Sequence, residues 1–454
     1  MLPSSLIQSL QFVKGFEQHA FETVHANDQL ITSVRLNSVK QPIFTNASSF
    51  VCQSTDTVAW CKYGRYLAER PSFTLDPLFH AGAYYVQEAS SMFLWQILKQ
   101  VLPNTSNKKI LDLCAAPGGK STLIAAYAPD ALLVSNEVIK TRAAILEENI
   151  IKWGNKNSVI TNNDPAHFKS LPDFFDMIVL DAPCSGSGLF RRDKNAINEW
   201  SEDAVELCAQ RQKRIIADVW DSLKEDGYLI YSTCSYSIKE NELIADWIKQ
   251  TFNTASINIK MESNWQIVET ISDAASYGYR FWPHLLRGEG FFVTVFQKKT
   301  TTDAGNFRTK FSLEKTNKSA ASIISEKVQI GDDCFLFNQS NQVACFPTAH
   351  EADLNLLKES LYIKSAGIKL GEIKHTDFIP DHHLAMANTV KLDYPRLEVQ
   401  LETALEYLRK KDIAVTGTKG WNLICYCGLH LGWIKVLPNR INNYYPMNYR
   451  ILKS

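Results

Sequence analysis

The sequence predicts an α/β fold, in which a doubly wound, mostly parallel sheet follows an N-terminal α+β accessory region and precedes a C-terminal β-rich domain. Two observations predict the sheet. From Lys109 onward, short and wholly apolar runs alternate with helical segments, which is typical of strands buried on both faces. A glycine-rich turn also follows the first of these runs, where doubly wound sheets bind their ligands.

Five apolar runs are the predicted parallel strands, and the segments between them are the predicted helices. The strands are 110–115, 131–138, 158–162, 175–180 and 228–232, and the helices are 120–128, 140–152, 203–223 and 239–250. Ser237 and Glu240 form a Ser-x-x-Glu capping pattern before the last helix. The run 291–297 is expected to end the sheet as an antiparallel strand.

Length and composition bound the other domains. The chain has 454 residues, which is room for about three domains. With 45% hydrophobic and 21% charged residues it has the composition of a folded protein with a large core, and extended disorder is excluded. The predicted division is an accessory region at 1–108, the sheet domain at 109–299, a linker at 300–327 rich in Thr, Ser, Lys and Asn, a small mixed domain at 328–388, and the β-rich domain at 389–454.

The last domain has the features of an RNA-binding surface. The 48 basic residues balance 48 acidic ones, so a polyanion must be bound by a local patch. Residues 413–454 hold five Lys or Arg and no Asp or Glu, with Trp421, Trp433 and Tyr444 among the interleaved aromatics. Cations for phosphates and aromatic faces for bases fit RNA contact, and an ordinary β-rich domain with a basic surface is the alternative.

The sequence also predicts the compartment. Ten cysteines without a Cys-x-x-Cys pair indicate free thiols in a reducing cytosol. Residues 1–22 lack the pattern of a secretory signal, and the apolar stretch 421–437 is broken by His430 and Lys435. We therefore expect a cytoplasmic protein without a membrane partner.

The turn after the first predicted strand is the candidate cofactor loop. Ala115, Ala116, Gly118 and Gly119 let the backbone approach a ligand closely, and the next helix offers free N–H groups to a carboxylate such as that of S-adenosyl-L-methionine. A Walker loop is excluded because Cys114 stands where it needs glycine, and Gly-x-Gly-x-x-Gly is absent. The alternative is a glycine turn without a ligand.

Two acids follow the next two predicted strands. Glu137 closes the second strand, where acids commonly accept hydrogen bonds from ribose hydroxyls. Asp164 closes the third and is a candidate contact for an adenine amino group. A solvated turn residue or a helix cap is the alternative for each acid.

Two cysteines follow the fourth and fifth predicted strands, Cys184 within Asp-Ala-Pro-Cys-Ser-Gly-Ser-Gly (181–188) and Cys234 within Ser-Thr-Cys-Ser (232–235). If these strands are neighbours, about 4.8 Å apart, both thiols flank one substrate. Methylation of cytosine at carbon 5 needs a nucleophile on carbon 6, for which a thiolate is suited, and an acid at nitrogen 3, for which Asp181 is placed. The residues alone do not choose between the two cysteines.

Other polar residues receive simpler interpretations. Cys52, Cys61, Cys208, Cys334 and Cys345 are expected to be structural, and Cys114 is expected to pack beside the cofactor. Cys425 and Cys427 would share one face of a strand, and no metal site is expected. His382 and His383 are expected at the surface. Arg191, Arg192 and Lys194 are candidate phosphate contacts or solvated charges.

The motifs Asp-Leu-Cys-Ala-Ala-Pro-Gly-Gly-Lys (112–120), 181–188 and 232–235 closely resemble those of the Sun/Fmu-type RNA 5-methylcytosine methyltransferases. The likeness extends to Gln87-Glu-Ala-Ser-Ser91, Arg280-Phe-Trp-Pro-His284 and Gly288-Glu-Gly-Phe-Phe292, and it covers about 80–299. It implies a Rossmann-like methyltransferase domain.

The resemblance also implies residue roles. S-adenosylmethionine would be bound by Cys114, Ala115, Ala116, Pro117, Gly118, Gly119, Lys120, Glu137, Asp164 and Asp181. Cys234 would be the covalent nucleophile, and Cys184 would assist release of the product. DNA cytosine methyltransferases attack with the cysteine of their Pro-Cys motif, so this choice rests on the family likeness alone.

The ends of the chain resemble one branch of the family. Residues 431–446 are similar to the tail of the bacterial ribosomal-RNA branch, the RsmF-like enzymes, which carry a PUA-like RNA-binding domain. Residues 32–37 resemble the family's N-terminal RNA-binding segment. Relatives usually have proline near Asn195, so the role of Lys194 stays open.

The resemblance therefore implies methylation of carbon 5 of a cytidine in ribosomal RNA, in the small subunit, by a monomer without an obligate protein partner. A transfer-RNA cytosine-5 methyltransferase is one alternative. A non-catalytic RNA-binding factor for ribosome assembly is another, and the intact Cys184, Cys234 and Asp181 argue against it.

Overall fold

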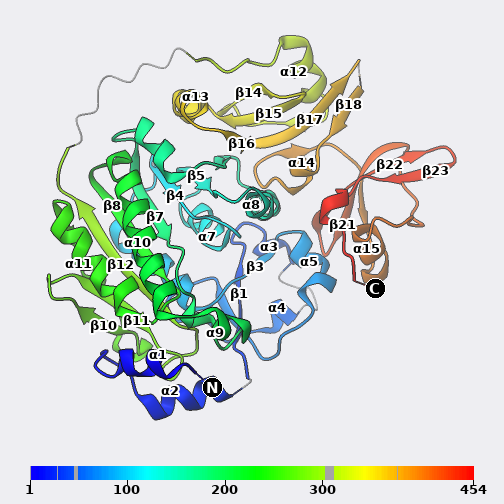
Figure 1. The fold of residues 1–454 in the computed structure, drawn as a ribbon. Coiled ribbons are helices and arrows are strands. Elements are labelled where there is room, and N and C mark those ends of the chain that lie inside the picture. The colour runs from blue at the N-terminus through cyan, green and yellow to red at the C-terminus, as the bar shows by residue number, and fades with distance from the viewer. Residues whose placement is uncertain (1, 28, 45–49, 302–310, 376, 454) are drawn as a thin grey trace.

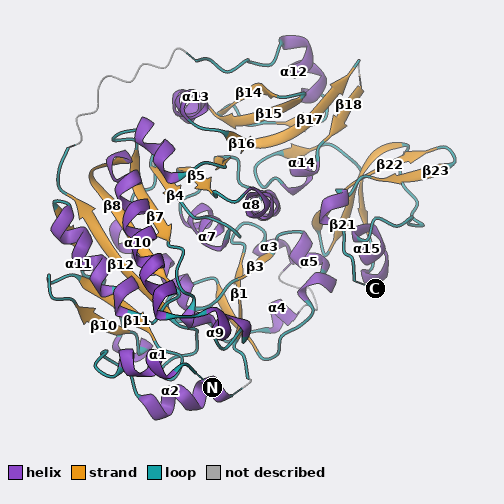
Figure 2. Cartoon of the chain, viewed as in Figure 1, coloured by secondary structure: helices purple, strands orange, loops and turns teal. Residues whose placement is uncertain are grey.

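A mixed sheet of ten strands runs through the middle of the molecule (Figures 1 and 2). The computed structural model describes residues 2–27, 29–44, 50–301, 311–375 and 377–453. The strand order is β10-β11-β12-β8-β7-β4-β5-β6-β16, and β9 pairs with the end of β12 on the edge opposite β8. This is the predicted doubly wound α/β class.

The five central strands are parallel, as the sequence predicts. They are β4 (Lys109–Asp112), β5 (Leu132–Asn136), β6 (Ser158–Thr161), β7 (Phe175–Asp181) and β8 (Leu223–Thr233). Successive side chains of β7 enter opposite cores: Ile178 and Leu180 pack on one face of the sheet, and Met177 and Val179 on the other. Burial on both faces explains why these runs are wholly apolar.

Helices cover both faces of the sheet. They are α6 (Leu94–Val101), α7 (Gly119–Tyr127), α8 (Lys140–Trp153), α10 (Glu202–Val219) and α11 (Glu242–Thr251), and the short α9 (Asn195–Glu199) precedes α10 in the chain. The predicted helix 203–223 ends early, because β8 begins at Leu223. The predicted capping box at 237–240 is wrong: Ser237 caps a short 3₁₀ turn at Ile238–Glu240, and Glu240 is turned inward to other partners.

The prediction that residues 291–297 end the sheet is half right. The strand there, β12 (Phe291–Lys298), is antiparallel to β8. Its other edge is paired as well, with β11 (Tyr277–Phe281) and β9 (Thr254–Ser256), so β12 is buried along almost its whole length. β10 (Val268–Ile271) pairs with β11 and extends the sheet further. On the opposite edge, β16 (Ile363–Ala366) pairs with β6 in antiparallel fashion.

The N-terminal residues form two helices and a small sheet. Helices α1 (Ser4–Leu10) and α2 (Gln18–Ala26) pack on Phe190, Tyr236 and Trp282 of the central domain. The sheet β2-β1-β3 consists of β1 (Thr32–Leu36), β2 (Gly64–Leu67) and β3 (Tyr84–Val86), with short helices α3 (Gln41–Phe44), α4 (Phe50–Gln53) and α5 (Pro77–His80) around it. Of the predicted linker, residues 302–310 lie outside the described part of the chain.

Two more four-stranded sheets follow. The first is β14 (Cys334–Gln339), β15 (Gln342–Pro347), β17 (Ile368–Lys374) and β18 (Asp377–Pro380), with α12 (Lys318–Ser325), α13 (Glu351–Ser360) and α14 (His382–Met386); a short ladder joins β13 (Val328–Gln329) to β19 (Lys391–Leu392). The second is β20 (Arg396–Glu398), β21 (Gly420–Tyr426), β22 (Leu429–Leu437) and β23 (Arg440–Asn443), with α15 (Leu401–Leu408).

The two ends of the chain share one core. Tyr407, Leu431 and Tyr445 of the C-terminal domain pack in the same cluster as Val34 and Tyr84 of the N-terminal sheet. Figure 1 shows α5 beside α15 and β21 accordingly. The N-terminal sheet is thus held between the central domain and the last domain.

Two minor predictions are wrong. His382 and His383 are buried in α14, which packs between β17 and β22, and burial lowers the pKa of each imidazole to about 3. Cys427 lies beyond the end of β21 in a turn with φ of 49°, so it does not share a strand face with buried Cys425. Among the described residues, no helix has the length and apolar character needed to span a membrane.

Candidate active site

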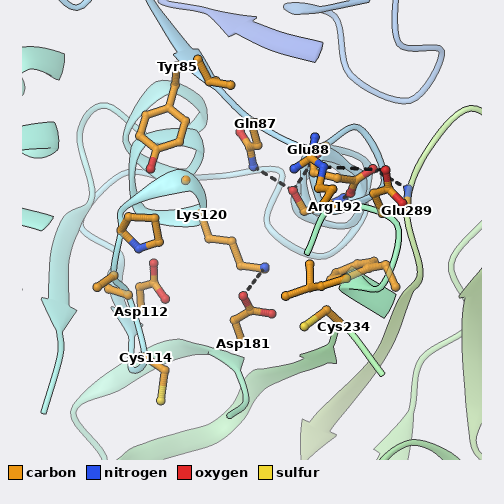
Figure 3. A pocket seen from close by; sticks show the side chains of 18 of the residues that line it. Tyr85, Gln87, Glu88, Asp112, Cys114, Lys120, Asp181, Arg192, Cys234 and Glu289 are labelled. Atoms are coloured by element: carbon orange, nitrogen blue, oxygen red, sulfur yellow. Dashed lines mark hydrogen bonds and ion pairs between the residues drawn. The ribbon is translucent and has the colours of Figure 1, made fainter. Parts of the chain in front are cut away.

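A cavity of about 430 Å³ opens at the carboxyl ends of β4, β7 and β8 (Figure 3). Its walls come from segments that are distant in sequence: the end of β3, the loop after β4, one residue of α8, the loops after β7 and β8, and the segment leading into β12. The lining residues are Tyr85, Val86, Gln87, Glu88, Ser91, Asp112, Cys114, Ala115, Ala116, Pro117, Gly119, Lys120, Arg142, Asp181, Leu189, Arg192, Cys234, Glu289, Gly290 and Phe291.

The predicted cofactor loop lies between β4 and α7. Two backbone hydrogen bonds attach it to the sheet, from the N–H of Leu113 to the carbonyl of Val179 at 3.0 Å and from the N–H of Ala115 to the carbonyl of Asn136 at 2.8 Å. Gly118 caps α7 with φ of 115°, a conformation that favours glycine. A Cβ on Gly119 would lie 3.4 Å from Cε1 of Tyr85 and would narrow the space between this loop and β3.

Two carboxylates and one lysine form the floor of the cavity. Fully buried Asp112 accepts a hydrogen bond from Oγ of Ser121 at 2.6 Å through Oδ2, while its Oδ1 has no hydrogen-bond partner among the described residues. Burial raises the pKa of Asp112 to about 7. Nζ of Lys120 lies 2.8 Å from Oδ2 of Asp181, and Oδ1 of Asp181 accepts from Oγ of Ser232 at 2.8 Å. Figure 3 shows this lysine bridging the cavity.

Glu137 and Asp164 are not among the residues that line the cavity. Glu137 is buried and accepts from the N–H of Ile139 at 3.0 Å, and its Oε2 lies 3.3 Å from Nη1 of Arg142. Arg142 does line the cavity and donates to the carbonyl of Ala116 at 2.7 Å. Asp164 caps the 3₁₀ turn Pro165–Ser170 by accepting from the N–H of Ala166, which is the alternative that the sequence left open.

The two candidate cysteines meet at the edge of the cavity. Their strands are neighbours, as expected, and Sγ of Cys184 lies 3.2 Å from Sγ of Cys234. The hydrogen bond with Cys234, together with burial, raises the pKa of the Cys184 thiol well above its ordinary value. Cys184 therefore stays protonated near neutral pH. Cys234 lines the cavity, and Cys184 lies behind it.

Glu240 joins the two cysteine loops, and the sequence analysis missed this role. Buried Glu240 accepts hydrogen bonds from the N–H and Oγ of Ser185 at 2.8 and 2.5 Å, from Oγ of Ser235 at 2.5 Å and from Nε2 of Gln212 at 3.2 Å. Its spacing from Ser237 is typical of a helix cap, so only the tertiary structure shows that the side chain is turned the other way.

An ionic cluster forms the rim next to Cys234. Burial raises the pKa of Glu289 to about 7, although Nη1 of Arg191 lies 3.3 Å and Nε of Arg192 3.7 Å from its carboxylate. Glu88 accepts from the N–H of Glu289 at 2.9 Å. The sequence analysis assigns no role to Glu88 or Glu289. Both belong to motifs that resemble the family, and this resemblance is the signal that could have identified them.

The three basic residues after the Asp181 loop differ in their surroundings. Arg191 is buried, so its interpretation as a phosphate contact or a solvated charge is wrong. Arg192 is partly exposed and lines the cavity. Lys194 donates to the carbonyl of His25 at 3.4 Å.

The segment 32–37, which resembles an RNA-binding segment, faces the protein instead. All five residues of β1 are buried. The expectation that this short segment contacts RNA is therefore wrong, because the N-terminal sheet packs with β1 between its neighbours and against the central domain.

The other cysteines have no shared chemistry. Cys61 and Cys345 are buried, Cys208 and Cys334 are partly buried, and all nine cysteines whose side chains are described are free thiols. The side chain of Cys52 lies outside the described part. Among the described residues, no group of His, Cys, Asp or Glu has the geometry to hold a metal ion.

The chain matches three family models. Residues 99–297 match 16S rRNA methyltransferase RsmB/F, residues 2–89 match the N-terminal domain of 16S rRNA methyltransferase RsmF, and residues 394–451 match the methyltransferase RsmF PUA domain.

Similar proteins align over most of their length. The ribosomal RNA small subunit methyltransferase F of Psychromonas ingrahamii is 32% identical over 86% of this chain and 84% of its own. That of Vibrio parahaemolyticus is 29% identical over 98% of this chain and 97% of its own.

Solved structures share the fold. A methyltransferase homolog from Pyrococcus horikoshii superposes with a TM-score of 0.51 at 25% identity, over 65% of this chain and all of that one. The crystal structure of NSun6 from Pyrococcus horikoshii with SFG superposes with a TM-score of 0.54 at 18% identity, over 66% of this chain and 98% of that one.

Proposed function

The chain belongs to the RsmF family of 16S rRNA methyltransferases, and from this premise we propose that it methylates carbon 5 of a cytidine in small-subunit ribosomal RNA, with S-adenosylmethionine as methyl donor and Cys234 as covalent nucleophile. One observation carries the assignment of roles. Cys234 lines the same cavity as the candidate cofactor loop, with the Cys184 thiol 3.2 Å behind it.

The residues around the cavity fit S-adenosylmethionine. The glycine turn leaves space next to the amino end of α7, whose free N–H groups suit a carboxylate, and the unpartnered Oδ1 of Asp112 suits an ammonium group. In our proposal Cys114–Lys120, Glu137, Asp164 and Asp181 hold the cofactor; Glu137 directly follows β5 and Asp164 lies three residues after β6, and both lie outside the lining of the cavity. When bound, the cofactor supplies an electrophilic methyl group.

The chemistry of this chain's residues follows from their positions. Sγ of Cys234 adds to carbon 6 of the cytosine, and the electrons of the 5,6 double bond then make carbon 5 nucleophilic. The proton released by the Cys234 thiol passes through Asp181, which is held by Lys120 and Ser232, to ring nitrogen 3. Asp181 then accepts a hydrogen bond from this N–H and so stabilises the adduct. Once carbon 5 carries the methyl group, its proton passes to Cys184, the proton on nitrogen 3 returns through Asp181 to solvent, the double bond re-forms and the sulfur of Cys234 leaves carbon 6.

Cys184 is suited to the release step. Because the Cys184 thiol is protonated, it acts first as an acid toward the sulfur of Cys234. The thiolate left on Cys184, whose pKa is raised, is then a strong base for the proton on carbon 5. At 3.2 Å it is also close enough to return a proton to the departing sulfur of Cys234. In this mechanism Cys234, at the cavity wall, forms the covalent bond, and Cys184, behind it, assists release.

We propose that the last domain supplies much of the grip on RNA. Lys435 lies 5.2 Å over the ring of Trp421, which meets the ring of partly exposed Tyr444 at 4.4 Å. A cation beside two aromatic rings that meet edge to face suits phosphates and unpaired bases. The N-terminal region would contribute surfaces other than buried β1. Such a substrate places the proposed activity in the cytoplasm, and we propose that the enzyme acts as a monomer.

Methylation assays test the substrate class. Purified protein with methyl-labelled S-adenosylmethionine is expected to label small ribosomal subunits or their RNA, and not bulk transfer RNA. Product with transfer RNA alone would defeat the ribosomal assignment. Bisulfite sequencing of total RNA from cells with and without the protein would then locate the cytidine. If every 5-methylcytosine signal remains in cells without the protein, the result would favour the non-catalytic assembly factor.

A further inference from the structure

The end of β3 forms a wall of the cavity that faces the cofactor loop. Tyr85 and Gln87 line the cavity there (Figure 3). A Cβ built on Gly119 would lie 3.7 Å from Nε2 of Gln87, so this amide lies over the amino end of α7. Gln87 belongs to the N-terminal part of the chain, outside the glycine loop and the strand ends at which doubly wound sheets bind their ligands.

Arg35 fixes which atom of the Gln87 amide faces the cavity. Nε of Arg35 lies 2.7 Å from Oε1 of Gln87. A guanidinium has only donors, so the amide oxygen must face it and the amide nitrogen must point the other way. The amide therefore presents its N–H groups to the cavity and cannot turn over without breaking this bond.

Arg35 is itself held rigidly against the cofactor loop. It is fully buried, and it donates to the carbonyl of Gly119 at 3.4 Å, to Oγ1 of Thr122 at 2.6 Å and to the carbonyl of Thr122 at 3.3 Å. Its guanidinium carbon lies 4.5 Å over the ring of Trp153. One side chain of β1 thus fixes the Gln87 amide relative to the first turn of α7.

The Gln87 amide has a donor to spare. Its Nε2 donates to Oγ of Ser91 at 3.3 Å and has no second acceptor within the described residues. Gln87 is 5% exposed and lines the cavity, so the remaining N–H is directed into the cavity and not to the outer surface. Together with the free N–H groups of the first turn of α7, this hydrogen points into a place suited to a carboxylate.

We propose that Gln87 is a further cofactor-binding residue, whose Nε2 donates to the amino-acid carboxylate of S-adenosylmethionine, and that Arg35 is the residue that positions it. This inference rests on the proposed function. It also gives the buried β1 segment a role: it links the N-terminal sheet to the shape of the cofactor site.

The substitution Gln87→Glu tests the donor directly. It keeps an oxygen for Arg35 and replaces the free N–H by a second oxygen. Calorimetric titration would use S-adenosylhomocysteine and its decarboxylated analogue 5′-(3-aminopropylthio)adenosine, which differ only in the carboxylate. The variant is expected to bind S-adenosylhomocysteine about 10- to 100-fold more weakly, as for a lost hydrogen bond to a charged group. Its affinity for the decarboxylated analogue should match that of the unmodified protein.

Matched variants separate this role from general damage to the cavity. Glu137→Gln should weaken both ligands equally, because both contain the ribose. Gln87→Ala, which adds no charge, should weaken S-adenosylhomocysteine alone and replaces the first variant if that one does not fold. Arg35→Lys should give a partial, equally selective loss.

Equal weakening of both ligands by Gln87→Glu and Gln87→Ala, or no weakening, would overturn the proposal. Failure of the unmodified protein to bind either ligand would instead refute the proposed function.

Discussion

The thiols of Cys184 and Cys234 lie 3.2 Å apart, although the two residues follow different strands and are separated by 50 positions in the sequence. The parallel pairing of β7 with β8 places Asp181 opposite Ser232, and each cysteine follows its strand by a few residues. The two loops are then joined by Glu240. The distance is therefore a consequence of strand register and one buried carboxylate.

We expect Cys234→Ala to abolish methylation, by about 10⁴-fold or more, because Cys114, the other thiol that lines the cavity within the described residues, belongs to the cofactor loop. Affinity for S-adenosylhomocysteine should stay near normal. Transfer of labelled methyl groups to ribosomal RNA measures the first effect, and calorimetry the second. Cys208→Ala, outside the cavity, is the matched control. Full activity of Cys234→Ala would contradict the assignment.

We expect Cys184→Ala to trap a covalent complex between protein and RNA. Cys234 can still add to the base, but release is impaired when the neighbouring thiol is missing. The adduct should appear as a slowly migrating band on a denaturing gel and disappear after ribonuclease treatment. The double variant with Cys234→Ala should show no band; a band in that variant would mean that another residue attacks the base.

Glu240→Gln should loosen the two cysteine loops. Four hydrogen bonds converge on this buried carboxylate, and an amide nitrogen cannot accept those made to one oxygen. We expect stability to fall by about 1–3 kcal/mol and kcat by at least about tenfold, with cofactor affinity unchanged. Glu206→Gln, an exposed acid on α10, should change neither quantity. Unchanged kcat in Glu240→Gln would show that loop position is set elsewhere.

Asp112→Asn should change how stability depends on pH. The pKa of Asp112 is about 7 in the folded protein against 3.8 ordinarily, so between these values the folded state keeps a proton that the unfolded chain has lost. Wild-type stability therefore falls as pH rises through this window and levels off above about 7. Relative to wild type, Asp112→Asn should gain at most about 1.4 kcal/mol per pH unit. Urea unfolding from pH 5 to 8 measures this, and a difference independent of pH would contradict it.

Lys435→Ala combined with Arg440→Ala should weaken RNA binding mainly by removing phosphate contacts. The slope of log affinity against log salt should fall by about 0.7–0.9 for each lost contact. Fluorescence anisotropy with a labelled ribosomal-RNA fragment at several salt concentrations measures this slope. Lys318→Ala, on exposed α12, is the control; an unchanged slope in the double variant would exclude β22 and β23 from the RNA interface.

Local sequence was enough for the central sheet and the catalytic motifs. All five parallel strands lie where apolar runs predict them, because a strand buried on both faces must be apolar throughout. The glycine turn at 118–119 likewise had to be a strand-to-helix connection. These features depend on neighbours within a few residues, so they can be read along the chain.

The sequence by itself determined the fold class, the cofactor loop and the two candidate thiols. Only the tertiary structure decided that Glu240 ties their loops together, that Arg35 is a buried brace and not an RNA contact, and that His382 and His383 are enclosed between two sheets. The physical reason is the same in each case. The direction and burial of a polar side chain depend on partners that are distant in sequence and that packing brings together. The spacing of residues along the chain does not reveal which partners these are.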